Sequence, residues 1–209
     1  MPNWTNNTIT VQNPDVIKRF INADGEFDFN LLIPMPESLN IESGSRTDEA
    51  IAIYVTNQLT IPVEQTNLSQ LISNIFNKDW AKEICERLTK KQDTDINQLY
   101  EMGKQYIFNK EHYGCYTWYE WCNRNWGTKW NACESYVEKD DMTVVFDTAW
   151  CLPEPIFQKM CEIFPDEPIS FHCVYEEGFY YDGENRNGEF TIVDEGTIYE
   201  DDEEEEIDA

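Results

Sequence analysis

The sequence predicts an α+β fold in which an antiparallel sheet carries helices on one face. Period-two alternation of polar and apolar residues occurs near both ends of the chain, at residues 8–11 and 169–175. Helical periodicity fills residues 46–126 between them. The order strand, helix, strand, strand over residues 143–193 is typical of a sheet covered by helices on one side.

Residues 1–45 are expected to contribute a strand, a helix and a second strand. Residues 8–11 read Thr-Ile-Thr-Val, which is the first strand. An Asn-Pro pair at positions 13–14 is typical of a helix cap followed by the first helical residue. Phe27 and Phe29 alternate with polar residues and predict the second, short strand.

Residues 46–126 are expected to form a helical insertion of modest charge. Apolar residues recur at spacings of three and four, and Thr94 or Asp95 is suited to cap one of the helices. The helices are expected at residues 68–76, at 79–88, at 96–107 and at 116–126.

Residues 127–193 are expected to return to the sheet. The segments 130–133, 143–146 and 169–175 predict strands, and 153–164 predicts a helix that Pro165 ends. The apolar runs 179–181 and 190–193 predict a hairpin joined by a long loop over residues 182–188. Residues 194–209, with ten acids and no base, are expected to be an acidic tail.

The acidity of the chain is concentrated in its last part. Residues 134–209 hold 24 Asp or Glu against three Lys or Arg, whereas residues 1–133 hold 17 against 12, and the net charge is −26. Such a surface repels phosphate, so direct binding to nucleic acid or to an anionic membrane is not expected. A localised field of this sign favours a basic protein as the partner.

Neither a secretory signal nor a membrane span is expected. Residues 2–10 are polar, the first Lys or Arg is Lys18, and no stretch approaches 18 apolar residues. The chain has seven cysteines, an odd number, and several lie within apolar periodicities. Reduced, mostly buried thiols and a cytoplasmic location are therefore expected rather than a disulfide framework.

Several short segments together resemble a family of phage- and plasmid-encoded proteins of unassigned function. They are Pro2-Asn3-Trp4 with Asn7, Ile33-Pro34-Met35-Pro36, Asn125-Trp126-Gly127-Thr128-Lys129-Trp130-Asn131-Ala132, Phe146-Asp147-Thr148-Ala149-Trp150 with Pro153, Phe164-Pro165, and Tyr175-Glu176-Glu177-Gly178. Two positions depart from the family pattern: Thr5 stands where Cys is frequent, and Cys151-Leu152 where Ser-Pro is frequent.

The resemblance implies a YubB-like, ferredoxin-like C-terminal domain, an origin in a mobile element and a bacterial host cytoplasm. A ferredoxin-like sheet would then be built from residues near 1–36 and 127–193. The resemblance brings no catalytic residues, so no enzyme activity and no cofactor are expected.

Histidine and cysteine give no convincing catalytic or metal site. His112 and His172 have no Cys or Asp at the local spacing of a triad or ligand set, so both are interpreted as surface or sheet-face residues. Cys115, Cys122 and Cys133 lack the close pair usual for zinc, and core packing is the better interpretation.

The segment around Gly127 is interpreted structurally. It lacks the preceding glycine and the spacing of a phosphate-binding loop, so Gly127 is expected to end a helix, with Trp126 and Trp130 as core residues and Lys129 over them. The aromatic residues Tyr116, Trp118, Tyr119 and Trp121 have few basic neighbours, which favours core or protein-interface use over base stacking.

The acids of the second half are the candidate partner-binding residues. A solvated acidic tail that aids solubility is the simplest interpretation, and it explains the acids after residue 193. It does not explain residues 134–193, which hold 14 acids against three bases. Carboxylates on a rigid surface would imitate the phosphates of a nucleic acid and occupy the groove of a basic host protein. The residues proposed are Glu176, Glu177, Asp182, Glu184, Glu189, Asp194, Glu195, Glu200, Asp201 and Asp202.

Three functions are thus considered. The first is a non-enzymatic inhibitor of a nucleic-acid-targeting defence system, of the anti-CRISPR or anti-restriction type, acting by mimicry. The second is an adaptor or scaffold that binds through its aromatic helical block. The third is a hydrolase whose carboxylates hold a divalent ion. The sequence leaves the target and the oligomeric state open.

Overall fold

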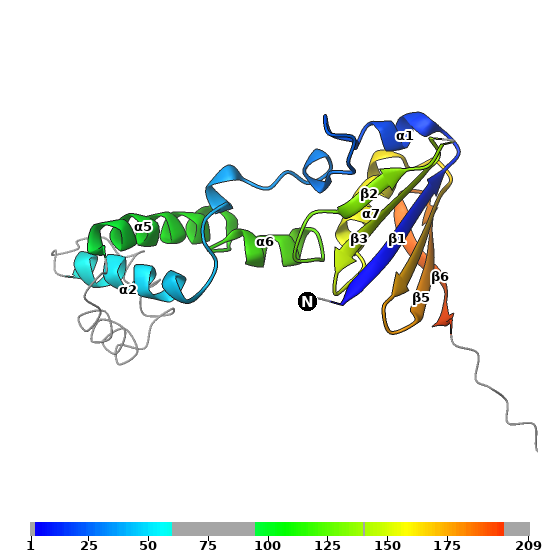
Figure 1. Ribbon diagram of the computed structural model, residues 1–209. Helices are drawn as coiled ribbons and strands as arrows, with labels where there is room; N and C mark the ends of the chain where they lie inside the picture. Colours follow the sequence, from blue (N-terminus) through cyan, green and yellow to red (C-terminus); the bar gives the residue numbers. More distant parts are fainter. Residues whose placement is uncertain (1–2, 60–94, 140, 199–209) are drawn as a thin grey trace, which may run out of the picture. The chain divides into compact units, whose positions relative to one another are not determined.

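The chain divides into two compact units. Figure 1 shows the computed structural model, which describes residues 3–59, 95–139 and 141–198. One unit, here the sheet unit, comprises residues 1–34 and 122–209, and the other, the helical unit, comprises residues 35–121.

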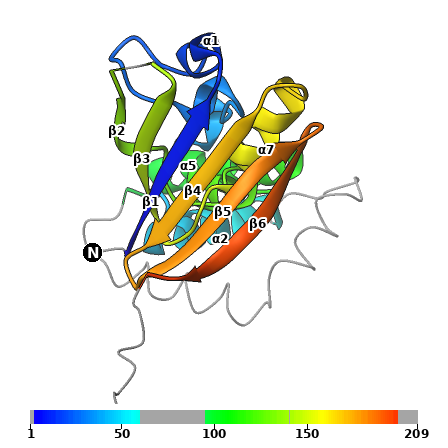
Figure 2. The same ribbon diagram turned by 90° about the vertical axis from the view of Figure 1, so that its right-hand side faces the viewer.

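The sheet unit is built on six antiparallel strands. Figure 2 looks onto this sheet, with α7 (Glu154–Ile163) behind it. Across the sheet the order is β2-β3-β1-β4-β5-β6, and every neighbouring pair is antiparallel. The strands are β1 (Trp4–Val11), β2 (Cys133–Val137), β3 (Thr143–Ala149), β4 (Ile169–Tyr175), β5 (Phe179–Arg186) and β6 (Glu189–Thr197).

The order of elements along the chain is ferredoxin-like. With α1 (Pro14–Lys18), the sheet unit runs β1-α1-β2-β3-α7-β4, and these four strands lie side by side as β2-β3-β1-β4. That is the β-α-β-β-α-β arrangement, to which β5 and β6 add a hairpin beyond β4. The predicted α+β, ferredoxin-like class is therefore confirmed.

The core of the sheet unit is aromatic. Ile156, Phe157 and Met160 of α7 are fully buried, and the Phe157 ring lies 4.5 Å from that of Phe171 and 5.4 Å from that of Phe190. Burial raises the pKa of the Cys161 and Cys173 thiols to about 12. These thiols are protonated at neutral pH and pack as small apolar groups, as expected from the sequence.

The predicted strand at Phe27 and Phe29 is wrong. Phe29 begins a short 3₁₀ helix, η1 (Phe29–Leu31), because the Asp28 side chain accepts a hydrogen bond from the Asn30 backbone. Phe27 makes only an isolated bridge with Ile21. Both rings are buried, and Phe27 stacks on Phe146 at 5.0 Å. The apolar residues at positions 27 and 29 alternate with polar ones because both rings are buried where the chain turns, and not because the segment is a β-strand.

The long loop predicted between β5 and β6 is also wrong. The strands continue to Arg186 and restart at Glu189, which leaves only Asn187 and Gly188 in the turn. Both have positive φ, 55° and 91°, as a two-residue hairpin turn of the Asn-Gly type requires. Residues 182–186 are consequently strand residues, and their side chains are held by the sheet.

The helical unit packs α2 (Ser45–Leu59) against α5 (Ile96–Tyr113). Asp95 caps α5 by accepting from the Gln98 backbone, as predicted. The unit also contains η2 (Glu37–Leu39), and α6 (Trp118–Asn125) runs across the boundary between the units. The helices expected at 68–76 and 79–88 lie outside the described residues, as does the tail beyond residue 198.

A glycine allows α2 and α5 to approach closely. A Cβ added at Gly103 of α5 would lie 2.1 Å from the backbone oxygen of Ala50 in α2. That oxygen is backbone and cannot rotate away, so any side chain here must separate the two helices.

We predict that Gly103→Ala lowers the free energy of unfolding by about 2 kcal/mol or more, because overpacking outweighs the gain of roughly 1 kcal/mol in helix propensity. Urea denaturation followed by far-UV circular dichroism measures this. Gly44→Ser is the matched control, since a Cβ at Gly44 meets nothing within 4 Å. Equal stabilities of the two variants would contradict the packing described.

Candidate functional site on the open face of the sheet

The two faces of the sheet differ sharply along β4. Ile169, Phe171 and Cys173 are buried, whereas Ser170 and His172 between them are exposed. Because side chains alternate along a strand and paired residues share a face, the exposed set extends across the neighbouring strands. We call it the open face, and its members on β1, β4, β5 and β6 are Asn6, Thr8, Thr10, Ser170, His172, Val174, Tyr180, Asp182, Glu184, Arg186, Glu189, Thr191, Val193 and Asp194.

A row of three charged or titratable side chains crosses three strands of the open face. His172 lies opposite Asp182, with its Nδ1 2.6 Å from Asp182 Oδ1, and Asp182 lies opposite Asp194. The side chains of His172 and Asp182 are 49% and 38% exposed. Two carboxylates placed directly opposite each other on neighbouring strands repel, so this arrangement costs stability.

A hydroxyl partly compensates the charge of Asp194. The Tyr180 hydroxyl donates a hydrogen bond to Asp194 Oδ2 at 3.0 Å. This hydrogen bond, and then the negative charge of Asp194, raise the pKa of Tyr180, because both favour the protonated phenol. The phenol therefore remains a hydrogen-bond donor to Asp194.

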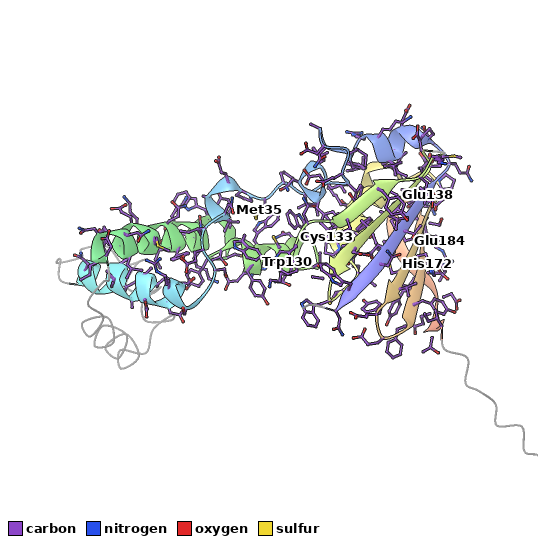
Figure 3. The ribbon with its side chains drawn as sticks, in the orientation of Figure 1. Met35, Trp130, Cys133, Glu138, His172 and Glu184 are labelled. Carbon is purple, nitrogen blue, oxygen red and sulfur yellow. The ribbon has the colours of Figure 1, made fainter. Side chains whose placement is uncertain are left out.

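Glu184 continues the acids along β5, two residues from Asp182. Figure 3 labels Glu184 on β5 and His172 on the neighbouring strand β4. Arg186 Nε lies 2.6 Å from Glu184 Oε1, and the side chains are 57% and 45% exposed. An ion pair this exposed is weak and is readily exchanged for another cation.

A shallow depression lies among these residues. Its volume is about 240 Å³, and the residues that line it are mostly polar: Thr8, Thr10, Ser170, His172, Asp182 and Glu184, with Phe171, Gly183 and Val193. A second depression of about 290 Å³ shares Thr10, Ser170 and Glu184 with the first. A lining of hydroxyls and carboxylates matches the donors of an ammonium or guanidinium group.

The structure brings together four of the acids proposed from the sequence and separates the others. Asp182, Glu184, Asp194 and Glu189 share the open face, where Glu189 lies opposite Arg186. Glu195 lies opposite Tyr181, which pairs with the buried Cys173, and so belongs to the other face. The proposed array is therefore smaller than expected.

Glu176 and Glu177 are used within the fold. They lie in the turn between β4 and β5, where Glu176 Oε2 accepts from the Trp4 backbone at 3.0 Å and Glu177 accepts from the Asn3 side chain. Their hydrogen bonds hold the start of β1 in place, and neither acid lies among the acids of the open face. The last three proposed acids, Glu200, Asp201 and Asp202, lie outside the described residues.

His172 of the open face and Asp147 of the neighbouring strand β3 are titratable residues that were not proposed from the sequence. His172 was assigned to a sheet face, but its pairing with Asp182 depends on the register of β4 and β5, which the sequence does not specify. Asp147 of β3 lies opposite Asn6 of β1, whose side chain donates to it at 2.9 Å. The only sequence feature that points to Asp147 is its position as a single acid within an apolar segment.

The segment around Gly127 has the structural roles predicted for it. Gly127 has φ of 77° just after α6, and Trp126 is buried and donates from Nε1 to the Ile33 carbonyl at 2.9 Å. Lys129 Nζ lies 4.3 Å from the centre of the Trp130 ring, although Trp130 itself is only half-buried. These residues stabilise the fold, and their contacts indicate no phosphate site.

The structure also agrees with the structural roles expected for His112, Cys115 and Cys122. His112 is exposed and stacks on Phe108 at 3.9 Å, while Cys115 and Cys122 are buried. Within residues 3–59, 95–139 and 141–198, no three His, Cys, Asp or Glu side chains are placed to hold a metal ion. No helix in those same ranges is both long and apolar enough to cross a bilayer.

Comparison with known proteins identifies a ferredoxin-like domain in the C-terminal part of the chain. Residues 125–209 match the family model described as a ferredoxin-like domain in Api92-like protein. The crystal structure of protein Api92 from Yersinia pseudotuberculosis aligns with a TM-score of 0.45 and 9% identity over 96% of this chain and 99% of that chain. No curated protein matches. The family-model match confirms the predicted ferredoxin-like C-terminal part, and an origin in a phage or plasmid stays a prediction.

We predict that Asp194→Asn raises the free energy of unfolding by about 0.2–1 kcal/mol at low salt, because it removes the repulsion from Asp182, and that 1 M NaCl removes the gain. The same substitution should lower the pKa of Tyr180 toward its ordinary value, which NMR titration of the ring measures. Asp24→Asn is the control, because it makes the same charge change in an exposed loop. A loss of stability in Asp194→Asn, with the control unchanged, would contradict the repulsion.

Proposed function

We propose that this chain is a non-enzymatic binding protein whose open face receives Lys or Arg side chains of a basic partner protein. The observation that carries the proposal is the pair Asp182 and Asp194, held opposite each other on adjacent strands. A like-charge pair on rigid backbone is costly alone and becomes favourable when a cation lies between or above it.

The depression beside this pair supports the same use. Its hydroxyls and carboxylates are acceptors, and the polar groups of a Lys or Arg side chain are only donors. Arg186 already places one guanidinium against Glu184 from within the chain. The cation of a partner would bind this surface in the same way, with Asp182, Asp194 and Glu184 as acceptors.

The finer proposal is that the partner normally binds nucleic acid. Strand geometry sets Asp182 and Glu184 roughly 7 Å apart along β5, and adjacent strands are about 5 Å apart. Carboxylates at these separations present a rigid row of charge to a groove that evolved for phosphates. The net charge of −26 adds long-range attraction to such a groove. The activity that follows is inhibition of a nucleic-acid-targeting defence protein in a bacterial cytoplasm, because the chain competes with nucleic acid for its groove.

The adaptor function is the second candidate, and exposed aromatic residues of the helical unit favour it. Phe108 and Tyr113 of α5 are 42% and 37% exposed, with ring centres 6.5 Å apart. Apolar docking at these residues would bury aromatic area and depend little on salt. Salt dependence therefore separates the two candidates.

We predict that a partner captured from bacterial lysate at low salt and then purified binds the triple variant Asp182→Asn, Glu184→Gln, Asp194→Asn at least about tenfold more weakly than the parent chain. Calorimetry at several salt concentrations gives the affinities, and duplex DNA or RNA should compete with the parent chain. The control is Asp24→Asn, Glu26→Gln, Asp166→Asn, which removes the same charge from exposed residues outside the open face.

The control should stay within about threefold of the parent chain. Equal losses in both triple variants would mean that only net charge matters, and an affinity unchanged between 50 mM and 500 mM NaCl would contradict the electrostatic proposal. Loss of binding on Phe108→Ala, with the open-face variant unaffected, would favour the adaptor function.

A further inference from the structure

The outer edge of β6 has no strand partner in the described part of the chain. β6 is the last strand of the sheet, and within residues 3–59, 95–139 and 141–198 it pairs only with β5. It is nine residues long, the longest strand of the sheet. The outward backbone groups of such an edge are a template for another strand.

A side chain already imitates a strand partner at the start of this edge. Gln158 of α7 accepts from the Phe190 backbone N–H at 3.0 Å and donates to the Gly188 carbonyl at 3.1 Å. The backbone N–H of Phe190 therefore points away from β5. Alternate residues of an antiparallel strand point the same way, so Ile192 also directs its N–H and C=O outward. The register shifts after Ile192, and its position precedes that bulge.

The opposite edge of the sheet is better protected than β6. β2 has five residues and an irregular register between Cys133 and Tyr136. Proteins commonly protect an edge strand with Lys, Pro, shortness or a bulge, and of these β6 has only the bulge that follows Ile192. The charged side chains of β6 are all acidic, so they repel an acidic strand and attract a basic one.

The acids of β6 lie on both of its faces. Asp194 is on the open face and Glu195 on the other, so a strand laid along the edge meets a carboxylate whichever way its side chains alternate. Ile192 and Val193, 43% and 45% exposed, add apolar contact between the acids at positions 189 and 194. A second copy of the chain fits poorly, because β6 contains three acids and no Lys or Arg.

We propose that the outer edge of β6 pairs, strand to strand, with an extended segment of the partner in which Lys or Arg alternates with β-branched apolar residues. This inference rests on the proposed function for the basic character of the partner and adds the element that docks. Main-chain hydrogen bonds to Ile192 would give affinity, and the basic side chains would reach Asp194 and Asp182 on the open face.

The test uses the full chain and an acetylated, amidated octapeptide of alternating Lys and Val. A second peptide has the same sequence and charge, but every backbone nitrogen is methylated, so it has no N–H to donate. We expect the unmodified peptide to bind at least about tenfold more tightly, as judged by calorimetry at 50 mM NaCl. Equal affinities of the two peptides, or no binding of either, would overturn the inference.

Two variants at one position locate the pairing. Ile192→Pro removes the outward N–H and should weaken peptide binding at least about tenfold, whereas Ile192→Thr keeps the N–H and should stay within about threefold. Circular dichroism shows whether Ile192→Pro is folded. If it is not, the comparison of the two peptides decides the matter alone.

The outcomes also separate this inference from the proposed function. If the open-face triple variant loses peptide binding while both peptides bind the parent chain equally, the open face binds cations and the edge does not pair. If the triple variant and 500 mM NaCl leave peptide binding unchanged, the proposed function fails while edge pairing stands. A dimer in light scattering that Ile192→Pro converts to a monomer would identify a second copy as the occupant and overturn the inference.

Discussion

The antiparallel register of the sheet is the constraint on which the site depends. β1 pairs with β3 on one side and with β4 on the other, over seven residues each, and so joins the two ends of the sheet unit. Because side chains alternate strictly, a slip of one residue would bring Ser170 and His172 into the core and expel Phe171. The buried aromatic face therefore fixes which polar side chains meet on the open face.

This register fixes the positions of the acids relative to one another, which amino-acid composition alone cannot do. The two-residue turn at Asn187 and Gly188 sets the register of the β5–β6 hairpin, and the bulge after Ile192 then shifts it by one residue, so that Asp194 lies opposite Asp182. In a flexible loop the two carboxylates would move apart and relieve their repulsion. On the sheet their backbone positions are fixed, so the repulsion remains, offset only in part by the hydrogen bond from the Tyr180 hydroxyl. Under the proposed function, the same arrangement would give both cation binding and a small loss of stability.

Most of the fold was predictable because its elements have simple periodicities. The apolar alternation of β4, the apolar stripe of α7 and the cap at Asp95 each have a local cause that the sequence displays. Phe27 and Phe29 were misassigned because a turn cap at Asp28 competes with the strand pattern. The tight hairpin was missed although its Asn-Gly turn is a recognised signal, because acidic residues at 182 and 184 resemble a loop by composition.

The candidate site was predictable only in part. Counting charges located the acidic region, but the faces of the strands decide which acids act together. Glu176, Glu177 and Glu195 are excluded by a turn and by strand parity, neither of which is visible without pairing partners. The pairing of His172 with Asp182 depends on residues ten positions apart on different strands. Long-range register is information that a single sequence does not supply.

The most direct test of the account is an NMR titration of the ¹⁵N-labelled chain with a short oligolysine peptide. The open face should respond first, with the largest amide shifts at Ser170, His172, Asp182 and Asp194, and the shifts should disappear in 500 mM NaCl. Shifts confined to α5, or spread evenly over every acidic residue of the chain, would contradict a localised cation-binding face.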